Sequence, residues 1–307
     1  MTLKRCCLIL IFIGAALSAV GLCGQAAVAQ EKIQIASLDK DISGHPVMLD
    51  AYLFKPTAPD TAAPFPAVVF LHGCGGLINP TGKILSRETD WAQRLTEQGY
   101  VVLAVDSFTS RGASSECARA GSVTPDTVRP FDAYGALRFL QTQPYVKADR
   151  IALIGWSHGG GTVLFSIGPH SPGHQTVGDK TQNTVPAASD FRAAIAFYPG
   201  WCNAFAQHAS SWNTAIPLLI LQGQSDVWTR AQPCEDFAQT VHANGMPVEI
   251  HLYPDAYHDF DFPNLPVSER PEFAKRNGAT PITGTNPAAR ADAIERVTAY
   301  LEHYLKH

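Results

Sequence analysis

The sequence predicts an α/β fold in which a mostly parallel central sheet is flanked by helices on both faces. Short, purely apolar runs recur along the chain, and amphipathic segments separate them. Strands without polar alternation are typical of a parallel sheet buried on both faces. In addition, 46% of the 307 residues are hydrophobic and 16% are charged, which suits one large globular domain and makes disorder improbable.

The expected elements begin with a pair of strands and continue as strand–helix units, the order of an α/β protein. Ile33–Leu38 and Val47–Phe54 form the leading pair, joined by a turn at residues 43–44. The buried strands that follow are Ala67–Leu71, Val101–Val105, Ile151–Ile154, Ala193–Phe197, Ile216–Leu221 and Val248–Leu252. The helices are Asp90–Gln98, Phe131–Gln141, Gly160–Ile167, Pro233–Ala243 and Ala288–Tyr304. Two polar segments, 169–189 and 263–287, have the length of functional caps or of flexible insertions.

Residues 1–29 are expected to be a secretory signal peptide. Two basic residues precede the apolar run Leu8–Val20, and small residues lead to a cleavage site after Ala29. A lipoprotein signal at Cys23 is disfavoured because Leu22 is bulky where a small residue is needed. The mature chain would then be a single domain, 30–307, located in the periplasm or secreted. Nothing later approaches the roughly 18 apolar residues of a membrane span.

Charge and cysteine usage narrow the possible partners. The formal net charge of −4 becomes −6 once the two basic residues of the leader are removed, and no run of Lys or Arg remains, so nucleic-acid binding is not expected.

Four cysteines stay in the mature chain: Cys74, Cys117, Cys202 and Cys234. Their even number in an exported protein suggests two disulfides, with three possible connectivities. Zinc is disfavoured because no two cysteines have C-x₂₋₄-C spacing. His170 and His174 have the H-x₃-H spacing of a metal site on a helix, but prolines place them in a loop, so we expect no metal there. No cofactor is expected either.

The pattern Gly155-Trp156-Ser157-His158-Gly159 directly follows an apolar strand and precedes two further glycines. A G-x-S-x-G sequence at a strand-to-helix junction predicts a nucleophile elbow, in which glycines make room for a serine on a sharp turn. The alternative is a glycine-rich turn without chemistry.

Asp226 follows the expected strand Ile216–Leu221, and His258 follows Val248–Leu252. Ligands of open α/β sheets sit at such carboxyl ends. We therefore expect a triad in which His258 takes the proton of Ser157 and a buried Asp226 orients the imidazole. Asp226 could instead only cap its loop. His258 could also belong to a solvated cluster with Asp255, Asp259 and Asp261, which are the competing acids in its own loop.

The oxyanion hole is expected from two backbone N–H groups, one on His158 and one in the glycine-rich loop 71–76. Cys74 is favoured as the second donor over Gly73. His72 is expected to brace this loop rather than to act as a second base.

Five segments occur in the order found in one known family. They are Leu71-His72-Gly73-Cys74-Gly75-Gly76-Leu77, Val105-Asp106-Ser107-Phe108 with Arg111-Gly112, Gly155-Trp156-Ser157-His158-Gly159-Gly160, Asp226-Val227-Trp228-Thr229 and Ala256-Tyr257-His258-Asp259-Phe260-Asp261. From about residue 45 to its end the chain resembles the dienelactone hydrolase family. The resemblance implies a single α/β-hydrolase domain without metal that hydrolyses ester or lactone bonds through a triad. The founding members carry cysteine where Ser157 stands and glutamate near His72, so ordinary serine esterase chemistry is favoured here.

Further expectations concern substrate contacts and disulfides. Arginines bind the substrate carboxylate in the family, and Arg111 lies in a comparable loop, where a loop-bracing ion pair is the alternative. Trp156 and Trp228 are expected to border the pocket. Mapping the cysteines onto the fold predicts the pairs Cys74–Cys117 and Cys202–Cys234. A peptidase or acyltransferase with the same triad, and a catalytically inactive binding protein, remain the rival functions.

Overall fold

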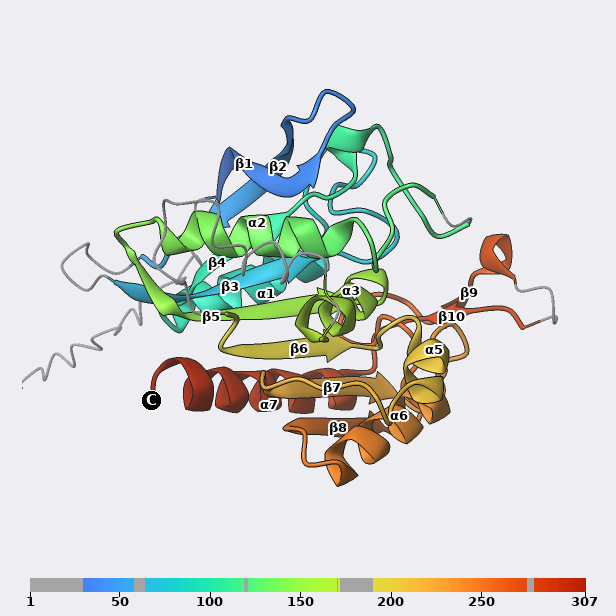
Figure 1. The fold of residues 1–307 in the computed structure, drawn as a ribbon. Coiled ribbons are helices and arrows are strands. Elements are labelled where there is room, and N and C mark those ends of the chain that lie inside the picture. The colour runs from blue at the N-terminus through green and yellow to red at the C-terminus, as the bar shows by residue number, and fades with distance from the viewer. Residues whose placement is uncertain (1–29, 58–63, 119–120, 170, 172–189, 275–278) are drawn as a thin grey trace, which may run out of the picture.

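An eight-stranded sheet forms the centre of the molecule, with the order β1-β2-β4-β3-β5-β6-β7-β8 (Figure 1). The computed structural model describes residues 30–57, 64–118, 121–169, 171, 190–274 and 279–307, so the signal peptide predicted for residues 1–29 lies outside them. β1 (Gln30–Lys40) and β2 (Pro46–Phe54) are antiparallel to each other, and β2 is antiparallel to β4. The other neighbours are parallel, and their strands are β3 (Phe65–Leu71), β4 (Val101–Val105), β5 (Val146–Trp156), β6 (Ala193–Phe197), β7 (Leu218–Gly223) and β8 (Val248–Tyr253).

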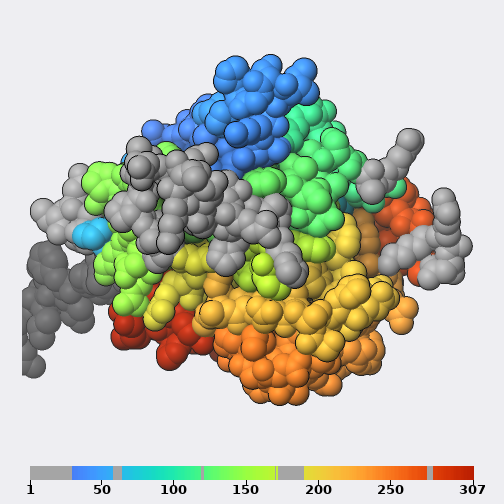
Figure 2. Space-filling view, viewed as in Figure 1, coloured from blue at the N-terminus to red at the C-terminus, as the bar shows by residue number. Residues whose placement is uncertain are grey.

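Helices cover both faces of this sheet, as the sequence predicts (Figure 1). One face carries α2 (Arg129–Gln141), α3 (His158–Ile167), α5 (Cys202–Gln207) and α6 (Ala231–Ala243). The other carries α1 (Ser86–Glu97) and α7 (Pro287–Leu305). Figure 2 shows the first face, with the N-terminal strands and the α6 region at opposite ends.

The absence of polar alternation in the strands has a direct explanation in the two hydrophobic cores. In β5, Ile151 and Leu153 pack into the core under α2 and α3, whereas Ala152 and Ile154 pack into the core under α1 and α7. Successive side chains of a strand point to opposite faces, so both sets must be apolar when both faces are covered.

Within the long segment 263–287, the described residues 263–274 and 279–287 form part of the fold. It contains β9 (Ser268–Glu269), the 3₁₀ turn η3 (Pro271–Phe273) and β10 (Ile282–Thr283), with β9 and β10 antiparallel. β10 returns to the loop after β8, where the backbone N–H of His258 donates to Ile282 O at 3.2 Å and the N–H of Gly284 donates to His258 O at 3.0 Å. The other long segment, 169–189, falls almost wholly outside the described residues.

The expected helices and strands are present, two strands (Val101–Val105 and Ala193–Phe197) with the predicted ends and most others with shifted ends. The short strands β9 and β10 and the helix α5 were not predicted. Helix α5 has only six residues, too few for a helical period to be visible in the sequence. The start of the C-terminal helix, α7, is explained by its local sequence. The side chain of Asn286 accepts a hydrogen bond from the N–H of Ala289, and Pro287 takes the first turn, a favourable helix start. Within the described residues, none of the helices has the length and apolar character required to span a bilayer.

Candidate active site

Ser157 lies on the turn between β5 and α3 in a left-handed backbone conformation, with φ of 53°. Such a conformation costs of order 1–3 kcal/mol and persists only where the surroundings fix it. Here the Ser157 N–H donates to Phe197 O at 2.9 Å, and the Ser157 carbonyl accepts from the N–H groups of Gly161 (2.8 Å) and Gly200 (2.9 Å). A Cβ at position 159 would lie 2.0 Å from Leu71 O, so the elbow needs glycine there. The predicted elbow geometry is present.

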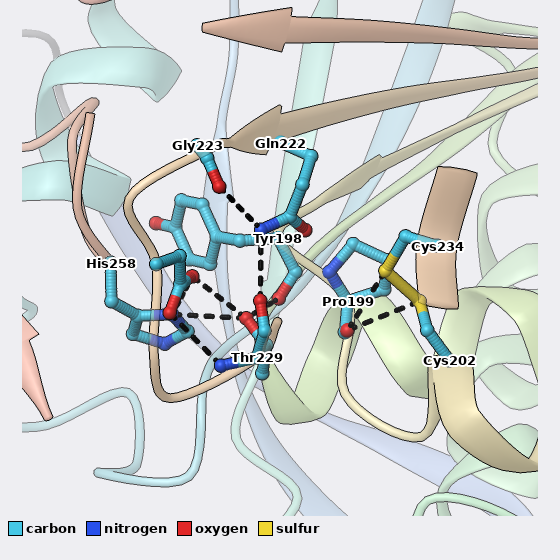
Figure 3. The surroundings of a disulfide bond; sticks show 9 residues. Tyr198, Pro199, Cys202, Gln222, Gly223, Thr229, Cys234 and His258 are labelled. Carbon is cyan, nitrogen blue, oxygen red and sulfur yellow. Dashed lines mark hydrogen bonds and ion pairs between the residues drawn. A yellow bond between two sulfur atoms is a disulfide. The ribbon is translucent and has the colours of Figure 1, made fainter. Parts of the chain in front are cut away.

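Asp226 and His258 come together from the loops after β7 and β8, and His258 lines the same cavity as Ser157. His258 Nδ1 lies 2.7 Å from Asp226 Oδ2, and both side chains are buried. The other carboxylate oxygen, Oδ1, accepts from the N–H groups of Trp228 (2.8 Å) and Thr229 (2.9 Å). The Thr229 hydroxyl lies 2.8 Å from Oδ2 and 3.2 Å from His258 Nδ1; Figure 3 shows this threonine between His258 and Tyr198. With its proton on Nδ1, the imidazole keeps Nε2 as a base.

Burial lowers the pKa of His258, but the charge and the hydrogen bond of Asp226 outweigh it, so the pKa lies above the ordinary 6.5. Asp259 raises the pKa further, and Arg87 lowers it. A buried histidine with a carboxylate on Nδ1 can therefore accept a proton and hold it as an imidazolium.

The three competing acids of the histidine loop have other roles. Asp255 is exposed. Asp259 pairs with Arg87, Oδ1 to Nη1, at 2.9 Å. Asp261 is fully buried and accepts hydrogen bonds from the indole N–H groups of Trp91 and Trp156, both at 2.8 Å, and from the Tyr198 hydroxyl at 2.6 Å.

Of the two expected oxyanion donors, His158 directly follows the serine and Cys74 lines the same cavity as the serine. His158 is the first residue of α3, and the first N–H groups of a helix have no acceptor within it. Among the described residues, the N–H groups of Cys74 and of Gly73, the alternative donor, both lack a backbone acceptor. Their loop is held by His72, which lies with Nδ1 2.7 Å from Gly73 O and accepts the Ser107 N–H on Nε2 at 3.2 Å. Burial, with Arg129 nearby, places the pKa of His72 well below 6.5, so this ring braces the loop as a neutral group.

Ser157 and His258 line one cavity of about 180 Å³. Its remaining lining includes Cys74, Arg87, Trp228, Asp259, Phe262, Arg270 and Phe273. The Trp228 ring lies 5.0 Å from that of His258 and stacks on Phe273 at 5.0 Å. A larger cavity of about 360 Å³ beside α3 and α5 contains neither Ser157 nor His258.

Of the three side chains expected to contact substrate, only Trp228 borders this cavity. The expectation for Trp156 is wrong: at the end of β5 its side chain turns into the core under α1 and α7, where it is fully buried. Arg111 is also not part of the lining. It pairs with Asp132 at 2.8 Å and Asp39 at 3.0 Å, which is the loop-bracing alternative.

Three further residues of the lining, Arg87, Arg270 and Phe273, could not be predicted from the sequence. Arg87 is the second residue of α1, and the other two lie in and beside η3, so all three reach the cavity only through long-range packing. No local motif marks them.

Both predicted disulfides are confirmed: Cys74 pairs with Cys117, and Cys202 pairs with Cys234. The first borders the cavity. The second joins the starts of α5 and α6, with both sulfur atoms near the carbonyl oxygen of Pro199, 3.5 and 3.8 Å away (Figure 3). Two disulfides indicate that the chain folds in an oxidising environment. Among the residues described, no cluster of three or more His, Cys, Asp or Glu could hold a metal ion.

Comparisons with known proteins place this site in context. A dipeptidyl aminopeptidase BIII from Pseudoxanthomonas mexicana is 25% identical over 264 residues, covering 78% of this chain and 37% of that protein. The acylamino-acid-releasing enzyme of Rattus norvegicus is 23% identical over 253 residues, covering 75% of this chain and 32% of its own length. The chain thus spans about a third of the length of these curated relatives.

Solved structures share the fold. Esterase 2 from Thermogutta terrifontis, phosphorylated by paraoxon, has a TM-score of 0.60 at 18% identity, covering 89% of this chain and 94% of that chain. Dipeptidyl peptidase 4 from Porphyromonas gingivalis has a TM-score of 0.61 at 20% identity, covering 91% of this chain and 36% of that chain. The fold is that of the α/β-hydrolases. Residues 49–176 and 181–305 match the dienelactone hydrolase family, and the chain therefore belongs to that family.

Proposed function

We propose that this protein is an exported serine hydrolase that cleaves small carboxylic esters or lactones through an acyl-enzyme. One observation carries the proposal: a strained Ser157 shares its cavity with His258, and the same His258 is held by Asp226 at 2.7 Å. A serine hydroxyl is a weak nucleophile until an adjacent base takes its proton, and this arrangement supplies the base and the group that orients it.

The reaction follows from this geometry. Ser157 Oγ attacks the carbonyl carbon while its proton passes to His258 Nε2, and the imidazolium is stabilised by Asp226. The negative oxygen of the tetrahedral intermediate accepts hydrogen bonds from the N–H groups of His158 and Cys74, each worth about 3–4 kcal/mol in the transition state. His258 then returns the proton to the leaving alkoxide. A water molecule, deprotonated by the same histidine, hydrolyses the acyl-enzyme.

The size and lining of the cavity support small, flat substrates. A volume of about 180 Å³ is close to the roughly 150 Å³ of an apolar cavity that binds benzene. Trp228 and Phe273 supply an aromatic wall beside His258, and the half-exposed Arg270 lies at the edge, paired with Glu272 at 2.8 Å. The disulfides and the leader predicted from the sequence support action in the periplasm or outside the cell.

A peptidase is the second candidate, because the curated relatives include a dipeptidyl aminopeptidase and an acylamino-acid-releasing enzyme. Comparing hydrolysis of matched nitrophenyl esters and nitroanilides separates the two functions. Because an activated ester is intrinsically more reactive than an anilide, the nitroanilide decides: we expect no measurable turnover of it, and its hydrolysis would favour the peptidase.

Ser157→Ala tests the nucleophile directly. We expect it to abolish covalent labelling by a fluorophosphonate and to lower hydrolysis of nitrophenyl acetate by about 10⁴-fold. Ser43→Ala, in the exposed turn between β1 and β2, serves as the control and should react like the unmodified protein. Labelling of Ser157→Ala at the normal rate would refute the proposal.

A further inference from the structure

A buried arginine forms part of the cavity beside the serine. The Arg87 side chain is only 3% exposed, and its guanidinium has three polar partners: Nη2 to Glu88 at 2.6 Å, Nη1 to Asp259 at 2.9 Å and Nη1 to the Tyr198 hydroxyl at 3.0 Å. It also packs 4.7 Å from the centre of the Phe262 ring. A planar guanidinium can serve several partners at once because its N–H groups form a fixed fork.

One of these partners is the residue next to the candidate base. Asp259 follows His258 and has φ of 62°, a backbone conformation that needs support. On the other side, the backbone of His258 is pinned by β10 through Ile282 and Gly284. The Tyr198 ring, whose hydroxyl accepts from Arg87, lies 4.5 Å from the His258 ring. Two sets of contacts therefore fix the position of His258. One is the pairing of its backbone with β10, and the other runs through Asp259 and Tyr198, which both contact Arg87.

We propose that Arg87 and Asp259 are positioning residues: their ion pair fixes the segment that carries His258, so that its imidazole faces Ser157. This inference rests on the proposed function, because it assigns a role in activating the serine. The two residues are 172 positions apart in sequence, and the contact ties the start of α1 to the loop after β8.

The pair also sets the charge around the imidazole. The charged groups that act on His258 are Asp226 and Asp259, which raise its pKa, and Arg87, which lowers it. The other groups against the ring, Trp228, Thr229 and Tyr198, are neutral at the pH of the reaction. Removing the charge of Asp259 should therefore lower the pKa of His258.

Asp259→Asn and Arg87→Lys separate the charge from the geometry. Asparagine keeps the shape and tolerates the left-handed backbone, but it carries no charge. Lysine keeps the charge of Arg87 but cannot bridge three partners at once. Asp255→Asn is the matched control, because Asp255 is exposed, lies in the same loop and also has a left-handed φ of 56°.

The readout is the rate of inactivation by a fluorophosphonate as a function of pH, with thermal unfolding to verify that each variant is folded. Asp259→Asn should move the midpoint of the acid limb to lower pH, whereas Asp255→Asn should leave it in place. Arg87→Lys should lower the plateau rate about tenfold without moving the midpoint. An Asp259→Asn midpoint equal to that of Asp255→Asn, or a full plateau rate in folded Arg87→Lys, would overturn the inference. An unmodified protein that does not react at all would instead refute the proposed function.

Discussion

Two buried histidines flank Ser157, and they differ in the charge of the group that each contacts. His258 pairs with the Asp226 carboxylate, and its pKa lies above 6.5. The His158 ring lies with Nδ1 2.7 Å from Nη1 of the fully buried Arg129, and burial, together with Arg129 and His72, lowers its pKa to about 2. Arginine can only donate, so His158 Nδ1 is an acceptor and the ring is neutral. Burial alone therefore does not make a base; the neighbouring charge decides.

The first test of this comparison places the same substitution at both histidines. His258→Asn removes the base, so we expect kcat/KM for ester hydrolysis to fall by about 10⁴-fold. His158→Asn keeps an acceptor for Arg129 and keeps its backbone N–H at the oxyanion position, so the loss should stay within about tenfold. Steady-state kinetics on nitrophenyl acetate measure both. Equal losses in the two variants would show that the contrast in partner charge has no catalytic meaning.

The second test concerns stability in acid. Because the folded-state pKa of His158 lies below its unfolded value, the unfolded chain binds a proton below pH 6.5 that the folded chain does not, so this histidine destabilises the fold as pH falls. Between pH 7.5 and 5 its contribution is about 2 kcal/mol. His158→Asn should therefore lose about 2 kcal/mol less unfolding free energy than the unmodified protein over this range.

Urea titrations at the two pH values measure this difference. His258 acts in the opposite direction, since a raised pKa gives stability that is complete below 6.5 and is lost as pH rises through the folded value. If His158→Asn loses as much stability on acidification as the unmodified protein, His158 does not resist protonation in the folded state.

The residues of the candidate triad could be predicted from the sequence because local patterns and strand ends mark them. Ser157 was identified because its elbow is a local pattern of glycines after an apolar strand, and that pattern is needed where a Cβ would collide with Leu71 O. Asp226 and His258 were found because parallel strands bring their carboxyl ends to one edge. The disulfide pairs followed from the same fold map.

Partners that lie far apart in sequence could not be derived in this way. Arg129 meets His158 across 29 residues, and Arg87 meets Asp259 across 172. The partner of a buried arginine depends on how the helices and loops pack, and the hydrophobic periodicity of the sequence contains no information about that packing. Arg111 illustrates the same limit: its loop was placed correctly, but its partners Asp39 and Asp132 were decided by tertiary contacts.

The smallest expected effect concerns the hydroxyl that supports the His258 pair. The Thr229 hydroxyl lies 2.8 Å from Asp226 Oδ2, 3.0 Å from Tyr198 O and 3.2 Å from His258 Nδ1. Thr229→Val removes this hydroxyl at nearly constant volume. Because one hydrogen bond contributes about 1 kcal/mol, kcat/KM should fall about fivefold. Thr229→Ser keeps the hydroxyl and should stay close to the unmodified value. If Thr229→Val keeps full activity while Thr229→Ser loses it, the methyl group rather than the hydroxyl matters, and the Asp226–His258 pair depends on packing at this position instead of on the hydrogen bond of the Thr229 hydroxyl.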